Sequence, residues 1–403
     1  MCEAWRRFPI WEGVAPEEWV DWRWQLENAI CDVEHLGRAL PLSPEEREEI
    51  SRVLLRYPMR ITPYYLSLIE DPQDPSDPVR LQVVPRAGEL EEPGEEDPLD
   101  EGRDSPVPGL THRYPDRVLL VTTAFCPTFC RHCTRKRIWG CWEESDPEEW
   151  FRYIKAHPEV RDVLVSGGSP LSLPIERLED ILKRLWEIPH VEVIRIGTRE
   201  PATLPQRLFD PELLEVLDRY SRKLWAIAQF NHPREVTPEA RDAVWNLLRL
   251  GIPVQNQTVL LKGVNDSLPV MRELMRRLLA AKVRPYYLLH GDPVRGAMHF
   301  RTGLARGIEI VEGLRGHISG LGVPCYMVDL PFGAGKVPVG PNYLVAMGEK
   351  AAVFRNYEGL LVAYPLDGER GEEEGGEGVS GLLSRGGALV PKGTSRLLRR
   401  GRA

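Results

Sequence analysis

The sequence predicts an α/β fold whose centre is a partial (β/α)6 TIM-like barrel, preceded by a helical region and followed by a short β meander. The first observation is that strand-like and helix-like runs alternate from about residue 115 onwards. The second is that apolar residues recur at helical spacing near the N-terminus, and the third is that short strand-like runs follow the alternating part. Strands that alternate with helices pair in parallel, and six such units curve into a partial barrel.

The N-terminal region, residues 1–110, is expected to be helical at first and to end in an acidic connector. Ser43 before Pro44 has the pattern of a helix N-cap followed by proline in the first turn. Residues 88–106 are acidic and contain Pro and Gly, which predicts a solvated connector rather than a helix or strand.

The predicted barrel occupies residues 111–320. Its strand-like runs are 117–124, 162–166, 191–197, 223–230, 253–260 and 283–289. Its helix-like runs are 147–156, 174–187, 210–220, 237–249, 267–281 and 303–317. Chemistry in such barrels gathers at the C-terminal ends of the strands. The residues that lie at those ends, and that we therefore expect around a common site, are Gly167, Gly168, Thr198, Arg199, Asn231, His232, Gln257, His290, Gly291 and Asp292.

The C-terminal segment, residues 321–367, is predicted to carry a Gly-rich loop and then a meander with strand-like runs at 343–348, 351–355 and 360–364. Residues 368–403 lose the apolar pattern and are rich in Glu and Gly, so we expect a disordered tail.

Composition and charge exclude several classes of protein. The chain has 403 residues, 42% of them hydrophobic, which suffices for one large domain and a smaller one. A net charge of -8 gives no basic surface of the kind that nucleic-acid-binding proteins use. No apolar run reaches the ~18 residues of a membrane span, and the N-terminus lacks the apolar core of a signal peptide. Seven cysteines in a chain of this length do not make a disulfide scaffold, and Cys2, Cys31, Cys141 and Cys325 are scattered, so we expect a cytoplasmic protein.

Cys126, Cys130 and Cys133 follow the first strand-like run of the barrel with the spacing C-x3-C-x2-C. Soft thiolate ligands on one loop suit three irons of a [4Fe-4S] cluster, and the missing fourth cysteine leaves one iron open. A structural zinc site, which needs four ligands, is the weaker alternative, and Cys141 stays open as a further ligand. The spacing resembles that of radical S-adenosylmethionine (SAM) enzymes, in which SAM binds the open iron.

Lys336 lies in a Gly-rich stretch between Gly333, Gly335 and Pro338. Such a lysine can contact phosphate, form a Schiff base with pyridoxal phosphate (PLP), or be a plain surface lysine. Val337 stands where a nucleotide-binding P-loop has Ser or Thr, so a P-loop is poorly supported. The local pattern alone favours the surface lysine.

The sequence closely resembles the lysine 2,3-aminomutase family from roughly Trp19 to Tyr364. The matching segments follow one another along the chain at 61–69, 104–117, 126–137, 163–168, 230–233, 284–287, 307–317 and 333–338. The resemblance implies a barrel of the radical SAM type and a reaction that moves an amino group from the α to the β carbon of an amino acid. It also implies three cofactors, a [4Fe-4S] cluster, SAM and PLP, and an electron donor such as flavodoxin or ferredoxin.

The resemblance further implies roles for single residues. Cys126, Cys130 and Cys133 match the cluster ligands, and Lys336 matches the lysine that binds PLP. Arg135 matches the arginine that pairs with the α-carboxylate of the substrate, a task that suits a bidentate guanidinium.

Asp292 and Asp329 match two carboxylates that hold the ε-ammonium of lysine in the family. Relatives specific for glutamate lack this pair, so its presence here favours lysine as the substrate. A distal cation in a dry pocket needs fixed negative charge, which two carboxylates provide.

The resemblance places further residues beside the cofactors. Gly167, Gly168 and Gln257 lie where relatives contact SAM. Arg113 and Arg117 lie in a segment near PLP and are expected to bind its phosphate.

Several positions depart from the family pattern. Ser169 stands where relatives often have Asp, so a SAM contact is expected to differ. Ser267 replaces a cysteine of many bacterial relatives, and no cysteine follows Cys325, so their intersubunit zinc site should be absent. That expectation leaves a homo-oligomer open. His290-Gly291 replaces a polar-and-cysteine pair, which predicts an altered pocket wall.

The first hypothesis is therefore a PLP- and SAM-dependent isomerase that converts L-lysine to β-lysine. An aminomutase for another amino acid, such as arginine or glutamate, is the nearest alternative. A non-catalytic iron–sulfur sensor is the alternative from another class, although a sensor does not require Lys336, Arg135 and the aspartate pair together.

Overall fold

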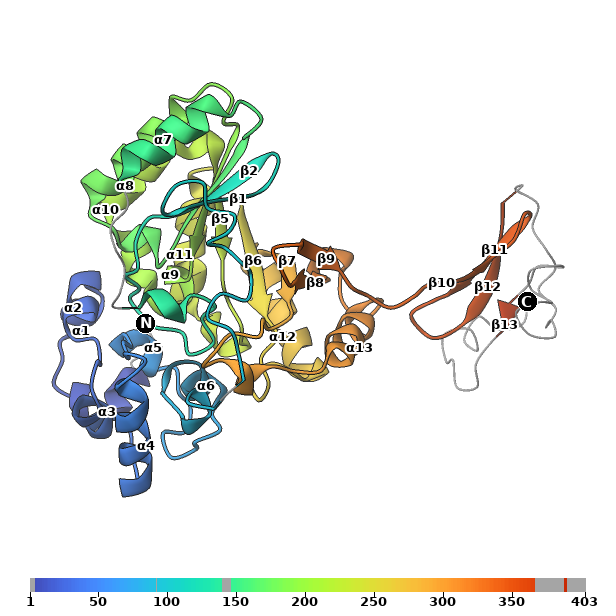
Figure 1. The fold of residues 1–403 in the computed structure, drawn as a ribbon. Helices are drawn as coiled ribbons and strands as arrows, with labels where there is room; N and C mark the ends of the chain where they lie inside the picture. Colours follow the sequence, from blue (N-terminus) through green and yellow to red (C-terminus); the bar gives the residue numbers. More distant parts are fainter. Residues whose placement is uncertain (1–3, 92, 140–145, 367–387, 390–403) are drawn as a thin grey trace.

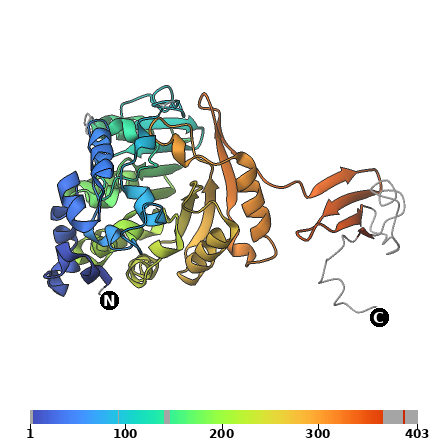
Figure 2. The same cartoon turned by 90° about the horizontal axis from the view of Figure 1, so that it is seen from below.

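The computed structural model describes residues 4–91, 93–139, 146–366 and 388–389. Its centre is a nine-stranded sheet in which the strands lie in chain order from β1 to β9. Strands β2 to β8 pair in parallel, whereas β1 and β9 pair antiparallel at the two edges. The strands are β1 Leu110–Tyr114, β2 Arg117–Val121, β3 Asp162–Ser166, β4 Val193–Thr198, β5 Leu224–Ala228, β6 Val254–Val259, β7 Arg284–Leu289, β8 Cys325–Leu330 and β9 Gly335–Pro338. The sheet curves into a partial barrel (Figures 1 and 2).

The six parallel strands that the sequence predicts are confirmed as β2 to β7. The structure adds β8 as a seventh parallel strand and β9 as its antiparallel neighbour. Lys336 therefore lies on a short strand, where the sequence predicts a loop. The sequence does not predict β9 because the segment is rich in glycine, which is depleted in strand interiors.

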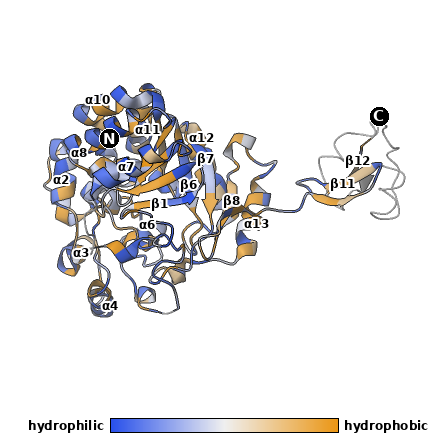
Figure 3. Ribbon diagram, turned by 45° about the horizontal axis from the view of Figure 1, so that its top comes forward, coloured by the Kyte–Doolittle hydropathy of each residue, from blue (hydrophilic) through white to orange (hydrophobic). Residues whose placement is uncertain are grey.

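Helices cover the outer face of the barrel, and the six that the sequence predicts are confirmed. They are α7 Pro147–Ala156, α8 Ile175–Trp186, α10 Pro211–Tyr220, α11 Pro238–Arg249, α12 Leu268–Ala280 and α13 Leu304–Leu314. The structure adds the short helix α9 Glu200–Thr203 after β4, which the sequence does not predict. Leu178, Ile181 and Leu185 of α8 belong to one buried core with Val163 and Val165 of β3. Burying each such side chain contributes about 1.5–3 kcal/mol. In Figure 3 these helices carry both hydrophobic residues, coloured orange, and hydrophilic residues, coloured blue.

The N-terminal region packs as a second buried core beside the barrel (Figure 1). Its helices are α1 Pro16–Trp19, α2 Trp22–Glu27, α3 Val33–Ala39, α4 Pro44–Leu54, α5 Pro63–Leu66 and α6 Pro78–Val83. The predicted cap of α4 is confirmed: Ser43 Oγ accepts from Glu46 N–H at 3.1 Å, and Glu46 Oε2 accepts from Ser43 N–H at 2.9 Å.

The C-terminal meander is confirmed as an antiparallel sheet that projects away from the barrel (Figure 1). Its strands are β10 Leu344–Met347, β11 Ala351–Arg355, β12 Leu361–Pro365 and β13 Ala388–Leu389. Apart from β13, the expected tail 368–403 lies outside the described residues. Among the helices in the described ranges, none has both the length and the apolar character needed to cross a bilayer.

Candidate active site

The loop after β2 brings the three motif cysteines together as half-buried free thiols. Burial raises the pKa of the Cys126 thiol, and repulsion from Cys133 and Cys130 raises it further. Burial and repulsion from Cys130 likewise raise the pKa of Cys133 to about 11. The charges of the three sulfurs therefore act on one another in one confined space.

In the described ranges, no three His, Cys, Asp or Glu side chains converge on a single metal ion. The three cysteines of a [4Fe-4S] cluster bind three different irons, so their sulfurs need not converge on one point. Soft thiolates are the ligands that such a cluster requires. The buried Nε–H of Arg199 has no hydrogen-bond partner among the described residues. This donor beside the cysteine loop is available to a group that the cysteines bind. The residues present fit the cluster.

Gly167 and Gly168 support the cysteine loop by close backbone contact. A Cβ at Gly168 would lie 2.2 Å from the carbonyl oxygen of Phe125. Gly167 has φ +117°, and a Cβ there would lie 2.5 Å from the carbonyl oxygen of Thr123. Ser169 N–H donates to Phe125 O at 2.7 Å, which joins the end of β3 to the loop. These glycines are required where two backbone segments touch.

The acidic connector holds the other side of the cysteine loop, so the expectation that it is solvated is wrong at several carboxylates. Glu89 is buried, and its Oε2 accepts from Arg131 Nη2 at 2.5 Å and from Lys136 Nζ at 2.6 Å. Arg131 lies between two of the motif cysteines, and Lys136 follows them. The carboxylates of the connector are therefore internal partners of the basic residues in the cysteine segment, and composition alone could not show this pairing.

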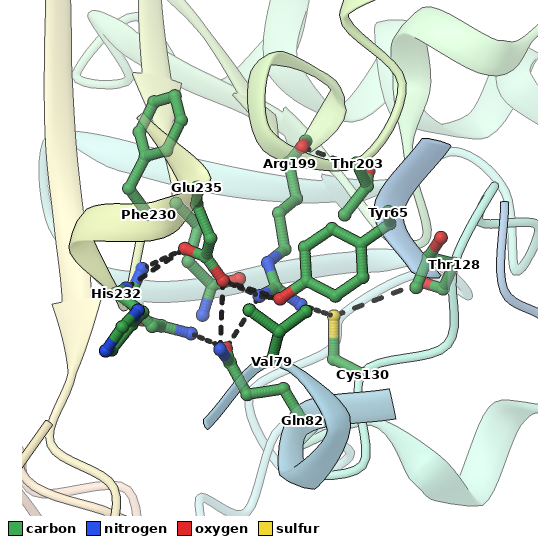
Figure 4. A network of polar contacts seen from close by, with 12 residues as sticks. Tyr65, Val79, Gln82, Thr128, Cys130, Arg199, Thr203, Phe230, His232 and Glu235 are labelled. Carbon is green, nitrogen blue, oxygen red and sulfur yellow. Dashed lines mark hydrogen bonds and ion pairs between the residues drawn. The ribbon is translucent and has the colours of Figure 1, made fainter. Parts of the chain in front are cut away.

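A second buried network touches the cysteine loop from the barrel side (Figure 4). Arg199, which follows β4, donates from Nη1 to Cys130 Sγ at 2.7 Å. Asn231, which follows β5, has its Nδ2 3.2 Å from His132 Nε2. The strand-end positions of Arg199 and Asn231 were expected near the site, but the contact of Arg199 with a cluster cysteine was not.

Lys336 meets one of the two predicted aspartates across the β8–β9 pair. Asp329 and Lys336 are register partners, and Lys336 Nζ donates to both Asp329 oxygens at 2.7 Å. The Asp329 side chain is 6% exposed, whereas that of Lys336 is 31% exposed and so stays reachable.

Asp292 lies near this pair, since the charges of Asp329 and Lys336 both act on it. Burial raises the pKa of Asp292 to about 7, and repulsion from Asp329 adds to the effect. The structure thus brings together the aspartate pair and the lysine that the sequence had joined only through a family resemblance.

Arg135 is engaged by a carboxylate of the connector. Its Nη2 donates to Glu101 Oε1 at 2.6 Å, and its Nε donates to Glu101 Oε2 at 3.2 Å. Burial alone would raise the pKa of Glu101, but attraction to Arg135 and Arg137 outweighs it and lowers the pKa to about 2. Glu101 therefore holds the bidentate position on Arg135 that a carboxylate ligand would take.

The segment around Arg113 lies against the strand of Lys336. Tyr114 Oη accepts from the Lys336 backbone N–H at 2.8 Å. Arg113 donates from Nε to Asp104 at 2.6 Å, and a Cβ added at Gly333 would lie 3.6 Å from the same Nε. The guanidinium of Arg117 lies 4.1 Å from the ring centroid of Tyr114.

The remaining predicted residues lie on the strand ends around this site. Gln257 is half-buried on β6, in register with Tyr287 of β7. In the pocket wall, His290 Nδ1 and Tyr326 Oη are hydrogen-bonded at 2.8 Å. Ser169, the departure from the family pattern, is buried and hydrogen-bonded to the buried carboxylate of Glu200.

Comparison with known proteins agrees with this geometry. The radical SAM superfamily model matches residues 120–275, and the lysine-2,3-aminomutase model matches residues 311–400. L-lysine 2,3-aminomutase of Clostridium subterminale is 47% identical over 409 residues, covering 97% of this chain and 98% of that protein. L-lysine 2,3-aminomutase of Bacillus subtilis is 44% identical, covering 90% of this chain and 77% of that protein. Glutamate 2,3-aminomutase of Clostridioides difficile is 42% identical, covering 86% of this chain and 82% of that protein.

The matches extend over the N-terminal region, the barrel and the C-terminal segment, so they concern the whole architecture rather than one motif. Radical SAM enzymes use a [4Fe-4S] cluster and SAM, which agrees with the three free cysteines after β2. The aminomutases among the relatives are isomerases. The chain belongs to the lysine 2,3-aminomutase family of radical SAM enzymes.

Proposed function

We propose that the protein is a PLP-dependent radical SAM enzyme that converts L-lysine to β-lysine. The observation that carries the proposal is the pocket in which Lys336 pairs with Asp329 beside Asp292. The carboxylates of Asp292 and Asp329 outnumber the single positive charge of Lys336. They therefore suit a substrate that carries a cation on its side chain, such as the ε-ammonium of lysine. The relatives that are named L-lysine 2,3-aminomutases support the same substrate.

Lys336 suits an anchor for PLP because its amine is fixed on a strand edge and partly exposed. In the proposal, Arg113 and Arg117 bind the phosphate of PLP from the segment that contacts this strand. When the α-amine of the substrate takes the place of Lys336 on PLP, Lys336 would be released as an amine beside Asp329. In the proposal this released amine is neutral, and Asp329 binds the ε-ammonium of the substrate together with Asp292.

Arg135 binds the α-carboxylate of the substrate in this proposal, in exchange for Glu101. Both ligands are carboxylates and accept the same pair of N–H donors, so the exchange needs no new geometry at the guanidinium. The enzyme would thereby select substrates by length, because the α-carboxylate must reach Arg135 while the side-chain cation reaches Asp292 and Asp329.

Cys126, Cys130 and Cys133 hold the cluster, and Gly167, Gly168 and Gln257 line the site of SAM. Bound there, the cluster and SAM supply a carbon-centred radical, and PLP supplies delocalisation of an unpaired electron on the substrate. The protein contributes position and exclusion of water, which the raised pKa of Asp292 reflects. The electron for the cluster comes from an external one-electron donor of the flavodoxin or ferredoxin type.

The test is anaerobic reconstitution with iron, sulfide, PLP, SAM and a reductant, followed by separate incubation with L-lysine, L-arginine and L-glutamate. We expect β-lysine from L-lysine and no β-amino product from L-glutamate, because two carboxylates repel a third. A β-amino product from L-glutamate or L-arginine in place of β-lysine would contradict the substrate assignment. SAM that stays intact beside a reduced cluster would favour the iron–sulfur sensor.

A further inference from the structure

The buried network around Arg199 has no part in the proposed substrate contacts. Arg199 directly follows β4, and its side chain is 8% exposed. Figure 4 shows this side chain among its polar partners. Nη1 donates to Cys130 Sγ at 2.7 Å. Nη2 donates to Tyr65 Oη at 2.9 Å, to Gln82 Oε1 at 2.7 Å and to Glu235 Oε1 at 2.8 Å.

Glu235 is the fixed anchor of this network and is fully buried. Its Oε1 also accepts from Tyr65 Oη at 2.6 Å and from Gln82 Nε2 at 3.0 Å. Its Oε2 accepts from the backbone N–H groups of Asn231 at 2.5 Å and His232 at 3.1 Å. With both oxygens engaged, the carboxylate cannot turn, and it holds the guanidinium in one orientation.

An ion pair that only joined the N-terminal region to the barrel would not need a contact with sulfur. Tyr65 of α5 and Gln82 of α6 already join these two parts through Glu235. Buried ion pairs also contribute little net stability because desolvation offsets the attraction. The hydrogen bond from Nη1 to the Cys130 sulfur instead indicates that Arg199 acts on the iron–sulfur cluster that the cysteines would bind.

We propose that Arg199 is a positioning residue for the iron–sulfur cluster, and that its charged hydrogen bond to the Cys130 sulfur raises the reduction potential of the cluster. Reduction adds one electron from an external donor to the cluster, and a fixed cation beside a ligand sulfur stabilises that added charge. Hydrogen bonds to the sulfurs, net charge and solvent exposure are the terms that set such potentials. Glu235 offsets part of this effect, but its contact is with Nη2, whereas the contact with the Cys130 sulfur is made by Nη1.

The consequence for the enzyme is that the cluster is easier to reduce by a given donor. Since SAM is cleaved only by the reduced cluster, Arg199 favours the state that begins the reaction. The inference rests on the proposed assignment of the three cysteines to the cluster.

The test is an EPR-monitored redox titration of the anaerobically reconstituted full chain, together with its iron and sulfide content. Arg199→Gln alone would strand Glu235 as a buried unpaired charge, so the measured variant is Arg199→Gln/Glu235→Gln. The matched control is Arg207→Gln/Asp210→Asn, which removes another buried ion pair that makes no hydrogen bond to the three cysteines.

We expect the equilibrium constant for reduction of Arg199→Gln/Glu235→Gln to fall about tenfold, which corresponds to a potential lower by about 59 mV. The control should keep the potential of the unmodified chain. If the double variant holds no cluster, Arg199→Lys keeps a cation but moves it from Cys130, and should lower the potential by less.

An unchanged potential at full iron content, in the double variant or in Arg199→Lys, would overturn the proposal. A fall of the same size in the control would overturn it too, because the effect would then belong to any lost ion pair. If the unmodified chain bound no [4Fe-4S] cluster, the cysteine assignment itself would be wrong, which separates that failure from this one.

Discussion

Lys336 and Asp329 face one another across the last two strands of the barrel sheet, with Nζ 2.7 Å from both carboxylate oxygens. The residue proposed to anchor PLP is thus neutralised by a residue proposed to bind substrate. In the proposed function this pair would couple cofactor binding to substrate binding, because a Lys336 that carries PLP no longer presents an ammonium group to Asp329. The predictions below concern this pocket and the loop of cysteines beside it.

Removal of the negative charges should affect lysine far more than an uncharged analogue. Asp292→Asn/Asp329→Asn leaves the ε-ammonium of lysine desolvated without a counter-ion, which costs about 3 kcal/mol, or roughly 100-fold in affinity. L-norleucine has the same chain without the ammonium, so its affinity should change little. The measurement is equilibrium binding of both amino acids to PLP-loaded protein without SAM. Equal losses for the two ligands would mean that the aspartates are structural.

Lysine affinity should increase as the pH rises through 7. In the protein without PLP, burial and the charge of Asp329 raise the pKa of Asp292 to about 7 against the opposing effect of Lys336, so Asp292 is mostly neutral below this pH and mostly charged above it. The substrate cation binds the charged form. Affinity should therefore rise about fivefold from pH 6 to 7 and less than about twofold from pH 7 to 8.

The control for this pH dependence is Asp292→Asn, which has no carboxyl to titrate at that position. Its lysine affinity should be lower at every pH and nearly flat between pH 6 and 8. A variant that kept the full slope would assign the titration to another group.

Glu101 should compete with the substrate for Arg135. Glu101→Gln removes the negative charge that occupies the guanidinium, so the dissociation constant for L-lysine should fall several-fold. Arg135→Lys cannot form a bidentate contact with a carboxylate, so it should raise the dissociation constant for L-lysine instead. Weaker lysine binding in Glu101→Gln would show that Glu101 orients Arg135 rather than competing for it.

A single methyl group at Gly168 should expel the cluster. A Cβ there would lie 2.2 Å from Phe125 O, so Gly168→Ala forces the cysteine loop away from β3. We expect little bound iron and sulfide after reconstitution. Gly303→Ala is the matched control, because its Cβ would meet nothing within 4 Å. Normal iron content in Gly168→Ala would refute the proposed role of this contact.

The barrel could be predicted from the sequence because its signals are local. Alternating strand-like and helix-like runs predict six strands and six helices, and the structure shows why a run such as 237–249 starts where it does: Thr237 caps α11 ahead of Pro238. The strand that carries Lys336 could not be predicted, because two glycines and two prolines surround the lysine and that composition is typical of a loop.

The long-range contacts of the site could not be predicted in this way. Glu89 and Glu101 appear in the sequence as members of an acidic run, and their arginine and lysine partners lie more than 30 residues away. Arg199 was expected at a strand end, yet its contact with Cys130 depends on anchors from three separate elements. Such pairings follow from the packed fold and leave no periodic pattern in the chain.

The most direct test of the account is to locate PLP on the chain. PLP-loaded protein is reduced with borohydride, digested and mapped by mass spectrometry, with Lys336→Ala treated in parallel. The account predicts a reduced pyridoxyl group on the peptide that contains Lys336, and no label in Lys336→Ala, which should still bind its iron. A label on another lysine, or unchanged turnover of L-lysine in Lys336→Ala, would contradict the account.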